Sequence, residues 1–372
     1  MVLGLRGFPG LEGGVERHAE HLYPLLVKLG CDVEVIVRSP YWTREQDHVW
    51  QGVRFRPLWS PRRSGLEALV HSFIGVIYAA FVRPDILHIQ AIGPAIVTPL
   101  ARLLGLRVIV THHGPDYDRE KWGRIARWVL RLGERAGMLF ANERIVISRV
   151  IQDLVRSKYA RESILIPNGV VVPELPSSMK ALDTFSLMPG RYILNVSRFV
   201  PEKRHEDLIA AFKQADLPGW KLALVGSTEK PSTYVRQLMT LAQGRDDIVF
   251  TGFQNGVALQ ELYAHAGVFV LPSSHEGLPI ALLEALSFGL PVLASDIPPN
   301  LGICLEQKRY FPLGDVEALA RRLRRSASEV IKEHERNVQR AWVRDRYNWN
   351  AIADSTLAIY ERVVRLEPRT RR

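Results

Sequence analysis

The sequence predicts two α/β domains, each built around a parallel, doubly wound sheet. Short apolar runs alternate with helical patterns along nearly the whole chain, which is typical of βαβ units. The alternation breaks over residues 164–190 and then starts again. The length of 372 residues suggests two domains. We therefore expect a first domain over residues 1–172 and a second over residues 173–345, with helices closing the chain.

The first domain is predicted element by element from its apolar runs. Residues 2–5 predict a strand, and a glycine-rich turn follows it. A helix then extends to about residue 29, where Gly30 stops it. Later strand-like runs lie at residues 33–37, 53–57, 86–89, 108–111 and 144–147. Helical patterns lie between most of them, at residues 65–82, 93–104, 119–136 and 149–158.

The second domain begins after a stretch in which the alternation of strand and helix patterns is lost. Residues 164–190 contain Pro, Ser and Gly but little periodicity, so we place the linker there. Strand-like runs follow at residues 192–196, 221–225, 248–250, 268–271 and 292–294. Helical patterns follow at residues 204–215, 231–243 and 256–265. Pro279 suits the first position of a further short helix, and Gly289 stops it.

Composition narrows the class of protein. Cys31 and Cys304 provide neither a disulfide framework nor metal-ligand spacing, so we expect a reducing compartment. The first residues lack the pattern of a secretory signal. The most apolar segment, residues 69–82, contains His71 and is shorter than the roughly 20 residues that a membrane span needs. We therefore expect a soluble, cytoplasmic protein.

The formal net charge of +10 is unevenly distributed. Residues 1–172 contain 23 Lys and Arg against 16 Asp and Glu, whereas residues 173–345 contain 20 of each. A basic first domain favours an anionic partner such as a membrane or a phosphorylated substrate, although a merely solvated surface explains it too. No recognition motif accompanies the charge, so we do not expect nucleic acid as a partner.

Residues 272–291 follow a predicted strand with a glycine-bearing turn and a short helix. Glu276 lies on the turn and Glu284 lies inside the helix. A helix N-terminus beyond a parallel strand binds anions, and carboxylates accept hydrogen bonds from a diol. A phosphate linked to sugars would use both features. Helix capping with one solvated glutamate is the alternative interpretation.

Three further features follow predicted strands. Adjacent Gly13 and Gly14, within Glu-Gly-Gly-Val-Glu, allow a ligand to approach the backbone, but they also suit a simple tight turn. Arg198 and Lys203 place two cations before a helix, which suits a diphosphate that gains charge as it leaves, or else a solvated loop. His112 and His113, within Thr-His-His-Gly-Pro-Asp-Tyr-Asp, could bond a hydroxyl or serve as ordinary loop residues.

Other chemistry finds little support in the sequence. The Asp-x-Asp pair at residues 116 and 118 has no evident third ligand, so we predict no metal site. There is no Ser–His–Asp or Cys–His arrangement with a nucleophile elbow, and no Walker A motif.

Taken together, these motifs resemble those of the retaining GT-B glycosyltransferases of family GT4. The resemblance rests on Glu-Gly-Gly-Val-Glu, His-His-Gly, Ser-Arg-Phe-x-Pro-Glu-Lys and the Glu-x7-Glu pair, in the family's order and across nearly the whole chain. It implies two Rossmann-like domains with parallel sheets facing across a cleft. It also implies that residues 346–372 return to the first domain. The N-terminal sequence resembles that of family members linked to exopolysaccharide and capsule assembly.

The family's site residues transfer by position. Arg198 and Lys203 would bind the donor diphosphate, approached by Gly13 and Gly14 from the first domain. Glu276 would contact the hydroxyls of the transferred sugar, and Glu284 would hold the ribose diol. His113 would face the reaction centre, with His112 the less favoured choice. The backbone near sugar and phosphate would be that of Gly277, Leu278, Pro279 and Ile280.

The resemblance also implies an activity. A hexose-type sugar would pass from a nucleotide-diphosphate sugar to a lipid-linked or growing polysaccharide acceptor, with retention of configuration and without a metal or other cofactor. In the family's usual proposal, the leaving diphosphate accepts the acceptor's proton. A nucleotide-sugar epimerase or phosphorylase on the same fold, and a non-catalytic sugar-binding homologue, remain alternatives. The pattern departs from the family at Arg204, where many relatives have Gly, and in its short first strand, which leaves open a start upstream.

Residues 119–136 predict a basic amphipathic helix. Apolar side chains recur at helical spacing, namely Trp122, Ile125, Val129 and Leu132. Arginines recur along a neighbouring face, namely Arg124, Arg127, Arg131 and Arg135. Such a helix can lie on an anionic membrane, here at the inner face, or pack on the sheet as an ordinary surface helix.

Overall fold

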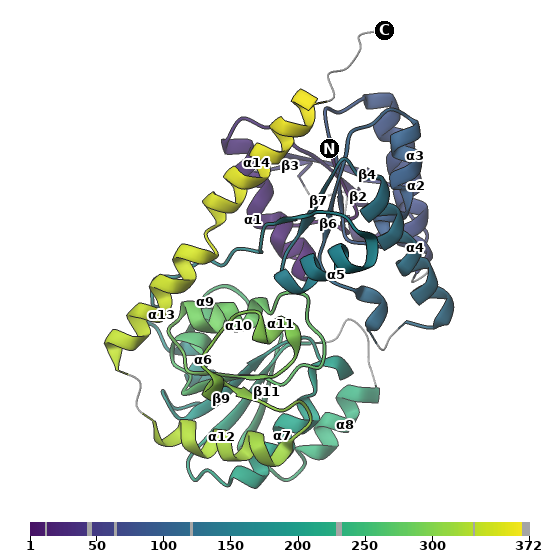
Figure 1. Ribbon diagram of the computed structural model, residues 1–372. Helices are drawn as coiled ribbons and strands as arrows, with labels where there is room; N and C mark the ends of the chain where they lie inside the picture. Colours follow the sequence, from purple (N-terminus) through teal and green to yellow (C-terminus); the bar gives the residue numbers. More distant parts are fainter. Residues whose placement is uncertain are drawn as a thin grey trace. The chain divides into compact units, whose positions relative to one another are not determined.

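The computed structural model describes the chain except residues 12, 43–46, 63–64, 120–121, 228–232, 330–331 and 367–372. The chain forms two compact units, shown in Figure 1. Unit 1 consists of Met1–Gly169 together with Trp349–Arg372, and unit 2 consists of Val170–Asn348. The sequence predicts that the first domain ends at residue 172 and that the chain returns to it at residue 346. In the structure, unit 1 ends at residue 169 and the chain returns to it at residue 349. Glu12 of the Glu-Gly-Gly-Val-Glu motif lies outside the described residues.

Unit 1 contains an eight-stranded sheet in the order β3-β4-β2-β1-β5-β6-β7-β8, parallel except for β3 against β4. Its strands are β1 (Val2–Leu3), β2 (Glu34–Arg38), β3 (Val49–Trp50), β4 (Val53–Leu58), β5 (Leu87–Gln90), β6 (Val108–His112), β7 (Glu143–Val146) and β8 (Ile164–Leu165). The chain moves one way from β1 and the other way from β5. The topological switch point therefore lies between β1 and β5, where loops diverge and leave room for a ligand.

The helices of unit 1 cover both faces of this sheet. They are α1 (Gly14–Lys28), η1 (Ser39–Tyr41), α2 (Leu66–Val82), η2 (Pro94–Val97), α3 (Thr98–Leu103), η3 (Asp116–Asp118), α4 (Arg124–Phe140), α5 (Arg149–Tyr159) and α14 (Trp349–Leu366). Helix α14 packs along α1, and its Ile352, Ile359 and Val363 join one hydrophobic core with Leu22 and Leu26. Right-handed crossovers place α2 to α5 on the opposite face.

Unit 2 contains a fully parallel six-stranded sheet in the order β11-β10-β9-β12-β13-β14. Its strands are β9 (Tyr192–Val196), β10 (Lys221–Val225), β11 (Ile248–Gly252), β12 (Val268–Leu271), β13 (Val292–Ser295) and β14 (Tyr310–Phe311). Its helices are α6 (Lys180–Thr184), η4 (Pro201–Lys203), α7 (His205–Ala215), α8 (Thr233–Leu241), α9 (Gly256–Ala264), α10 (Ile280–Ser287), α11 (Pro298–Leu301), η5 (Gln307–Arg309), α12 (Val316–Ser328) and α13 (Glu333–Arg346). The switch point lies between β9 and β12.

The structure corrects several of the predicted elements. The two-residue strands β3, β8 and β14 were not predicted, because so short a run has no periodicity. The expected linker contains α6, held where Glu261 accepts a hydrogen bond from the Ala181 N–H at 2.7 Å. Pro279 is the residue before α10 rather than its first residue. Helix α4 begins at Arg124, so Trp122 precedes it.

The buried face of α4 is not formed by the apolar residues that the alternative of packing on the sheet requires. Its buried residues are Gly133, Glu134, Gly137 and Met138, whereas Ile125 is exposed. The second half of α4 packs on the sheet because glycines allow a close approach. A Cβ at Gly133 would lie 2.2 Å from the Ile92 carbonyl oxygen.

Replacing Gly133 should therefore destabilise unit 1. Alanine raises helix propensity by about 1 kcal/mol, but the Gly133→Ala methyl would meet backbone that cannot move aside. We expect a net loss of about 1–3 kcal/mol, measured as a lower thermal unfolding midpoint. Gly123→Ser is the matched control, because a Cβ there meets nothing within 4 Å. An unchanged midpoint for Gly133→Ala would show that the close packing is not tight.

Buried histidines make unit 1 sensitive to acid. Burial lowers the pKa of His18 and of His71 to about 4, and that of His88 to about 3. The folded state therefore binds fewer protons than the unfolded chain below the ordinary histidine pKa of about 6.5. Their contribution to stability is complete above that pH and decreases as the pH falls towards 4.

Between about pH 7 and pH 5 we expect the free energy of unfolding to fall by up to about 1.4 kcal/mol per pH unit for each histidine, measured as a lower thermal unfolding midpoint. His71→Leu removes one titrating group and should flatten this dependence. Equal midpoints at both pH values would contradict the expectation, since few carboxylates titrate in this window.

Candidate functional site

In unit 2, the predicted cations and carboxylates meet at the switch point of the sheet. Strands β9 and β12 are adjacent. Arg198 and Lys203 lie on the segment after β9, and Glu276 lies on the segment after β12. Parallel strands end at the same edge, and the loops leaving these two strands diverge. The polar side chains therefore gather where α/β sheets bind ligands.

The two segments are directly joined. The Lys203 Nζ and a Glu276 carboxylate oxygen form an ion pair at 2.6 Å, with both side chains largely buried. The Ser274 N–H donates a hydrogen bond to the Glu202 carbonyl at 2.9 Å. The Arg198 guanidinium, in contrast, forms no hydrogen bond or ion pair with the described residues and is only partly exposed. One cation is therefore held by a carboxylate, and a second is available to an anion.

Helix α10 forms another wall of this region. It follows the Gly277–Pro279 turn, and no side chain caps its N-terminus. Uncapped N–H groups and the helix dipole attract anions. Glu284, one turn further along, accepts a hydrogen bond from the Tyr263 hydroxyl at 3.1 Å. That bond fixes one carboxylate oxygen and orients the group.

A buried network that the sequence did not reveal supports the Arg198–Lys203 segment. His205 Nε2 lies 2.9 Å from the Ser197 hydroxyl, which donates to the Asn195 side-chain oxygen at 3.0 Å. Asn195 donates in turn to the Val270 carbonyl of β12 at 2.9 Å. Burial first, and then the charge of Lys203, lowers the pKa of His205 to about 3. A neutral histidine thus ties the cationic segment to both central strands.

In unit 1, the glycine pair lies at the start of α1. Gly13, at φ 152°, precedes the helix and Gly14 begins it. A Cβ at Gly13 would lie 2.1 Å from a Glu16 carboxylate oxygen. Glu16 accepts a hydrogen bond from the Arg6 guanidinium at 2.9 Å. Glycine at position 13 suits the positive φ and leaves room for the Arg6–Glu16 pair at the switch point between β1 and β5.

His113 follows β6 and is oriented by Gln90, which ends β5. Its Nε2 lies 2.6 Å from the Gln90 side-chain oxygen. Because an amide oxygen only accepts, Nε2 must carry the proton. Burial, and then the neighbouring His18, lowers the pKa of His113 well below its usual range, so the ring is neutral. The buried Nδ1, which has no partner among the described residues, is therefore a hydrogen-bond acceptor.

Gln90 is a site residue that sequence reasoning missed. It is fully buried, and its amide also donates to the Tyr23 hydroxyl at 2.5 Å. A lone glutamine at the end of a strand gives no signal by itself. His112 has a different position: its Nε2 lies 2.9 Å from the buried Glu134 carboxylate, and its Nδ1 accepts from the Gly114 N–H. His112 therefore shapes the turn, and His113 is the one with a spare acceptor.

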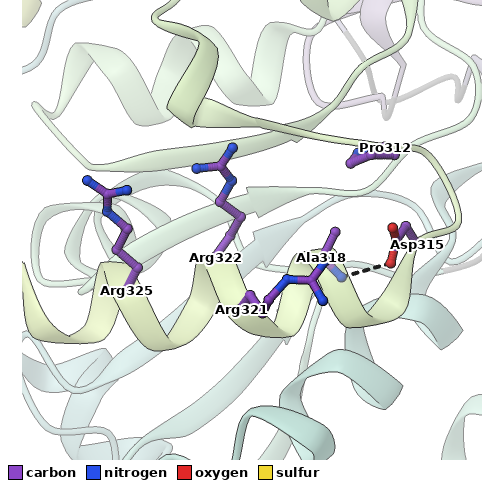
Figure 2. A pocket seen from close by; sticks show the side chains of 6 residues that line it. All are labelled: Pro312, Asp315, Ala318, Arg321, Arg322 and Arg325. Atoms are coloured by element: carbon purple, nitrogen blue, oxygen red, sulfur yellow. Dashed lines mark hydrogen bonds between the residues drawn. The ribbon is translucent and has the colours of Figure 1, made fainter.

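A separate basic hollow lies on α12, as Figure 2 shows. It encloses about 400 Å³ and is lined by Pro312, Asp315, Ala318, Arg321, Arg322 and Arg325. Asp315 caps the helix through the Ala318 N–H at 2.8 Å. Arg321 pairs with the exposed Glu317 of the same helix, and Arg325 pairs with the exposed Glu329 that follows it. None of the predicted site residues lines it.

Two family models match the chain in order. Residues 13–169 match the model described as glycosyl transferase 4-like domain, and residues 186–341 match the model described as glycosyl transferases group 1. The first match covers most of the contiguous part of unit 1, and the second covers most of unit 2.

Curated relatives share part of the sequence. An uncharacterized glycosyltransferase of Methanocaldococcus jannaschii is 31% identical over 176 residues, which are 46% of this chain and 45% of that protein. The chain thus matches less than half the length of this relative. A GDP-mannose-dependent alpha-(1-6)-phosphatidylinositol monomannoside mannosyltransferase of Mycolicibacterium smegmatis is 27% identical over 319 residues, covering 79% of this chain and 80% of that protein.

Solved structures share the fold. Sucrose-phosphate synthase from Thermosynechococcus elongatus has a TM-score of 0.79 at 22% identity, covering 98% of this chain and 99% of that one. Anabaena HepE, in complex with UDP and glucose, has a TM-score of 0.78 at 18% identity, covering 97% and 99%. From the two consecutive family matches and this shared fold, the chain belongs to the GT4 family of glycosyltransferases and has the GT-B fold.

Proposed function

We propose that this protein transfers a hexose-type sugar from a nucleoside-diphosphate sugar to an acceptor hydroxyl. The observation that supports this most directly is the polar cluster at the β9–β12 switch point. There, Arg198 is without a partner among the described residues, and Lys203 is held by Glu276. A dianionic diphosphate is the ligand that fits two cations beside an uncapped helix N-terminus.

Each residue then has a role in binding the donor. Arg198 and Lys203 bind the diphosphate, together with the backbone of residues 277–280. Glu276 accepts hydrogen bonds from the transferred sugar, and its ion pair with Lys203 holds the carboxylate in place for that purpose. Glu284, oriented by Tyr263, accepts from the ribose diol. The names of two similar proteins support this donor class, one by GDP-mannose and the other by bound UDP and glucose.

The proposed reaction retains configuration and needs no protein nucleophile. The acceptor oxygen bonds to the anomeric carbon on the face from which the diphosphate leaves. The bond between that carbon and the phosphate oxygen breaks, and its electron pair stays on the diphosphate. The diphosphate oxygen then takes the acceptor's proton. Arg198 and Lys203 stabilise the charge that develops on the leaving group, which is the work a metal ion does elsewhere.

The acceptor is proposed to be lipid-linked or a growing polysaccharide. Unit 1 holds most of the excess positive charge, which favours an acceptor presented at an anionic membrane. One relative's name includes phosphatidylinositol monomannoside, a lipid. Together with the N-terminal resemblance, these features favour exopolysaccharide or glycolipid assembly by a peripheral enzyme at the inner face of the membrane. Among the described helices, none has both the length and the hydropathy needed to cross a bilayer.

A panel of nucleotide sugars and nucleoside diphosphates tests the donor class first. A ligand that binds only the folded state raises the unfolding midpoint, and the stabilisation grows with the logarithm of ligand concentration above the Kd. We expect a nucleoside diphosphate to raise it. Release of the diphosphate only in the presence of an acceptor would separate transfer from epimerisation. Dependence on a nucleotide donor rather than on inorganic phosphate would separate it from phosphorolysis.

Removing either cation should slow transfer with little effect on folding. We expect Arg198→Ala or Lys203→Ala to lower donor turnover roughly 100-fold or more, because charge that develops in the transition state loses a partner. Arg245→Ala is the matched control, since that arginine pairs with Asp247 at the amino end of β11. Near-normal turnover by either site variant would remove it from the leaving-group role.

Gln90 should act through His113. Gln90→Leu removes the acceptor for the Nε2 proton, so the ring loses its fixed tautomer and its spare Nδ1 acceptor. We expect turnover to fall roughly ten-fold, while nucleoside-diphosphate binding by unit 2 is unchanged. Imidazole nitrogen shifts should report the Nε2–H tautomer in the wild type and a mixture in the variant. A single unchanged tautomer in Gln90→Leu would show that Gln90 does not position the ring.

A further inference from the structure

Helix α2 has an unusual outward face. Its buried side is formed by small and polar residues, including Gly75 and Ala79, because it packs closely over β1. Its opposite side exposes only large apolar side chains. Phe73, Ile77 and Phe81, spaced four residues apart, lie on one stripe, and Phe81 is 84% exposed. The helix is thus apolar on the face where a surface helix is normally polar.

This stripe contains no charge. The single charged residue of α2, Glu67, is paired with Arg38 at 2.9 Å and also accepts a hydrogen bond from the Tyr41 hydroxyl. Leu66 extends the exposed apolar face by a further two turns towards the helix start. A continuous apolar stripe along a helix of 17 residues is costly to leave in water, and such patches mark contact surfaces.

The same face of unit 1 continues onto α3 and α4. Both α2 and α4 pack against η2, and α3 packs against each of them. Figure 1 shows the three helices together along one side of unit 1. Leu103, at the end of α3, and Ile125 and Trp128, in the first half of α4, are strongly exposed. Because α4 buries Gly133 and Gly137 against the sheet side, these apolar residues point outward with the stripe.

Arginines accompany the apolar residues on α4. Arg124, Arg131 and Arg135 are exposed and share one side of the helix, since they recur at intervals of seven and four residues. Ile125 and Trp128 lie on that side as well. An exposed helix face with both large apolar side chains and arginines is typical of a segment lying in the interface of an anionic bilayer.

We propose that the outward face of α2, α3 and α4 docks on a membrane containing anionic lipid, with the stripe Phe73, Ile77 and Phe81 inserted among the acyl chains. A second copy of the chain fits less well, because two-fold pairing of this face would bring its arginines towards like charge. Anionic headgroups neutralise them instead. This inference deepens the peripheral-membrane part of the proposed function by naming the surface.

Co-sedimentation of the full chain with vesicles tests the proposal. We expect binding to phosphatidylcholine vesicles containing phosphatidylglycerol, and much weaker binding to phosphatidylcholine alone. The stripe variant Phe73→Ser, Ile77→Ser, Phe81→Ser should bind the anionic vesicles roughly ten-fold or more weakly, and should bind no better at low salt. The charge variant Arg124→Gln, Arg135→Gln should lose mainly the preference for anionic lipid and the sensitivity to salt.

The matched control is Met188→Ser, Met239→Ser, Val257→Ser, which removes three similarly exposed apolar side chains from unit 2. It should bind vesicles like the wild type. Undiminished vesicle binding by the stripe variant would overturn the proposal. The proposal would also be overturned if the wild type formed a dimer and bound no vesicles while the stripe variant was a monomer. A second copy of the chain would then cover this face.

The nucleoside-diphosphate thermal shift separates this proposal from the donor chemistry. A chain that gains stability from the nucleotide but ignores vesicles would refute only the docking surface. A chain that binds vesicles but no nucleotide would refute only the proposed transfer.

Discussion

The Lys203–Glu276 ion pair is the interaction on which the arrangement of unit 2 depends. It lies at the switch point between β9 and β12, and it joins the two loops that diverge from the ends of these strands. Burial removes both charges from water, and this desolvation cost is offset only if the pair and further hydrogen bonds satisfy each charged group. Two further contacts hold these segments in place beside the ion pair: the Ser274 N–H donates to the Glu202 carbonyl, and His205 bonds the Ser197 hydroxyl. The result is a fixed carboxylate beside a cation that is ready for an anion.

The two units use opposite electrostatics at equivalent places in their sheets. Unit 2 gathers formal charges, which suits a ligand whose own charge increases during reaction. Unit 1 gathers histidines that burial keeps neutral, linked through Gln90. Neutral acceptors and donors can bind hydroxyl groups without attracting stray ions. This contrast suits a division in which one unit holds the diphosphate and the other holds a sugar or an alcohol.

The sequence predicted most of the strands and helices, because apolar periodicity and glycine stops are local signals. It also predicted that Arg198, Lys203 and Glu276 follow strands, as they do in the structure, whereas their roles stay predictions. It did not predict Gln90 or His205, whose importance comes from partners more than 20 and 8 residues away that folding brings near. Nor did it predict the stripe on α2: an apolar run looks the same whether the fold buries it or leaves it outside.

The return of α14 to unit 1 affects the order in which the protein can mature. Ile352, Ala353, Ile359 and Val363 complete the first hydrophobic core, yet they are synthesised after the whole of unit 2. The two ends of unit 2, which lies between these parts of unit 1 in the chain, are joined by a hydrogen bond from the Val170 N–H to the Tyr347 carbonyl at 2.9 Å. Domains generally fold as units during synthesis. Unit 2 is therefore able to fold before unit 1 has its complete core, because α14 is synthesised after unit 2.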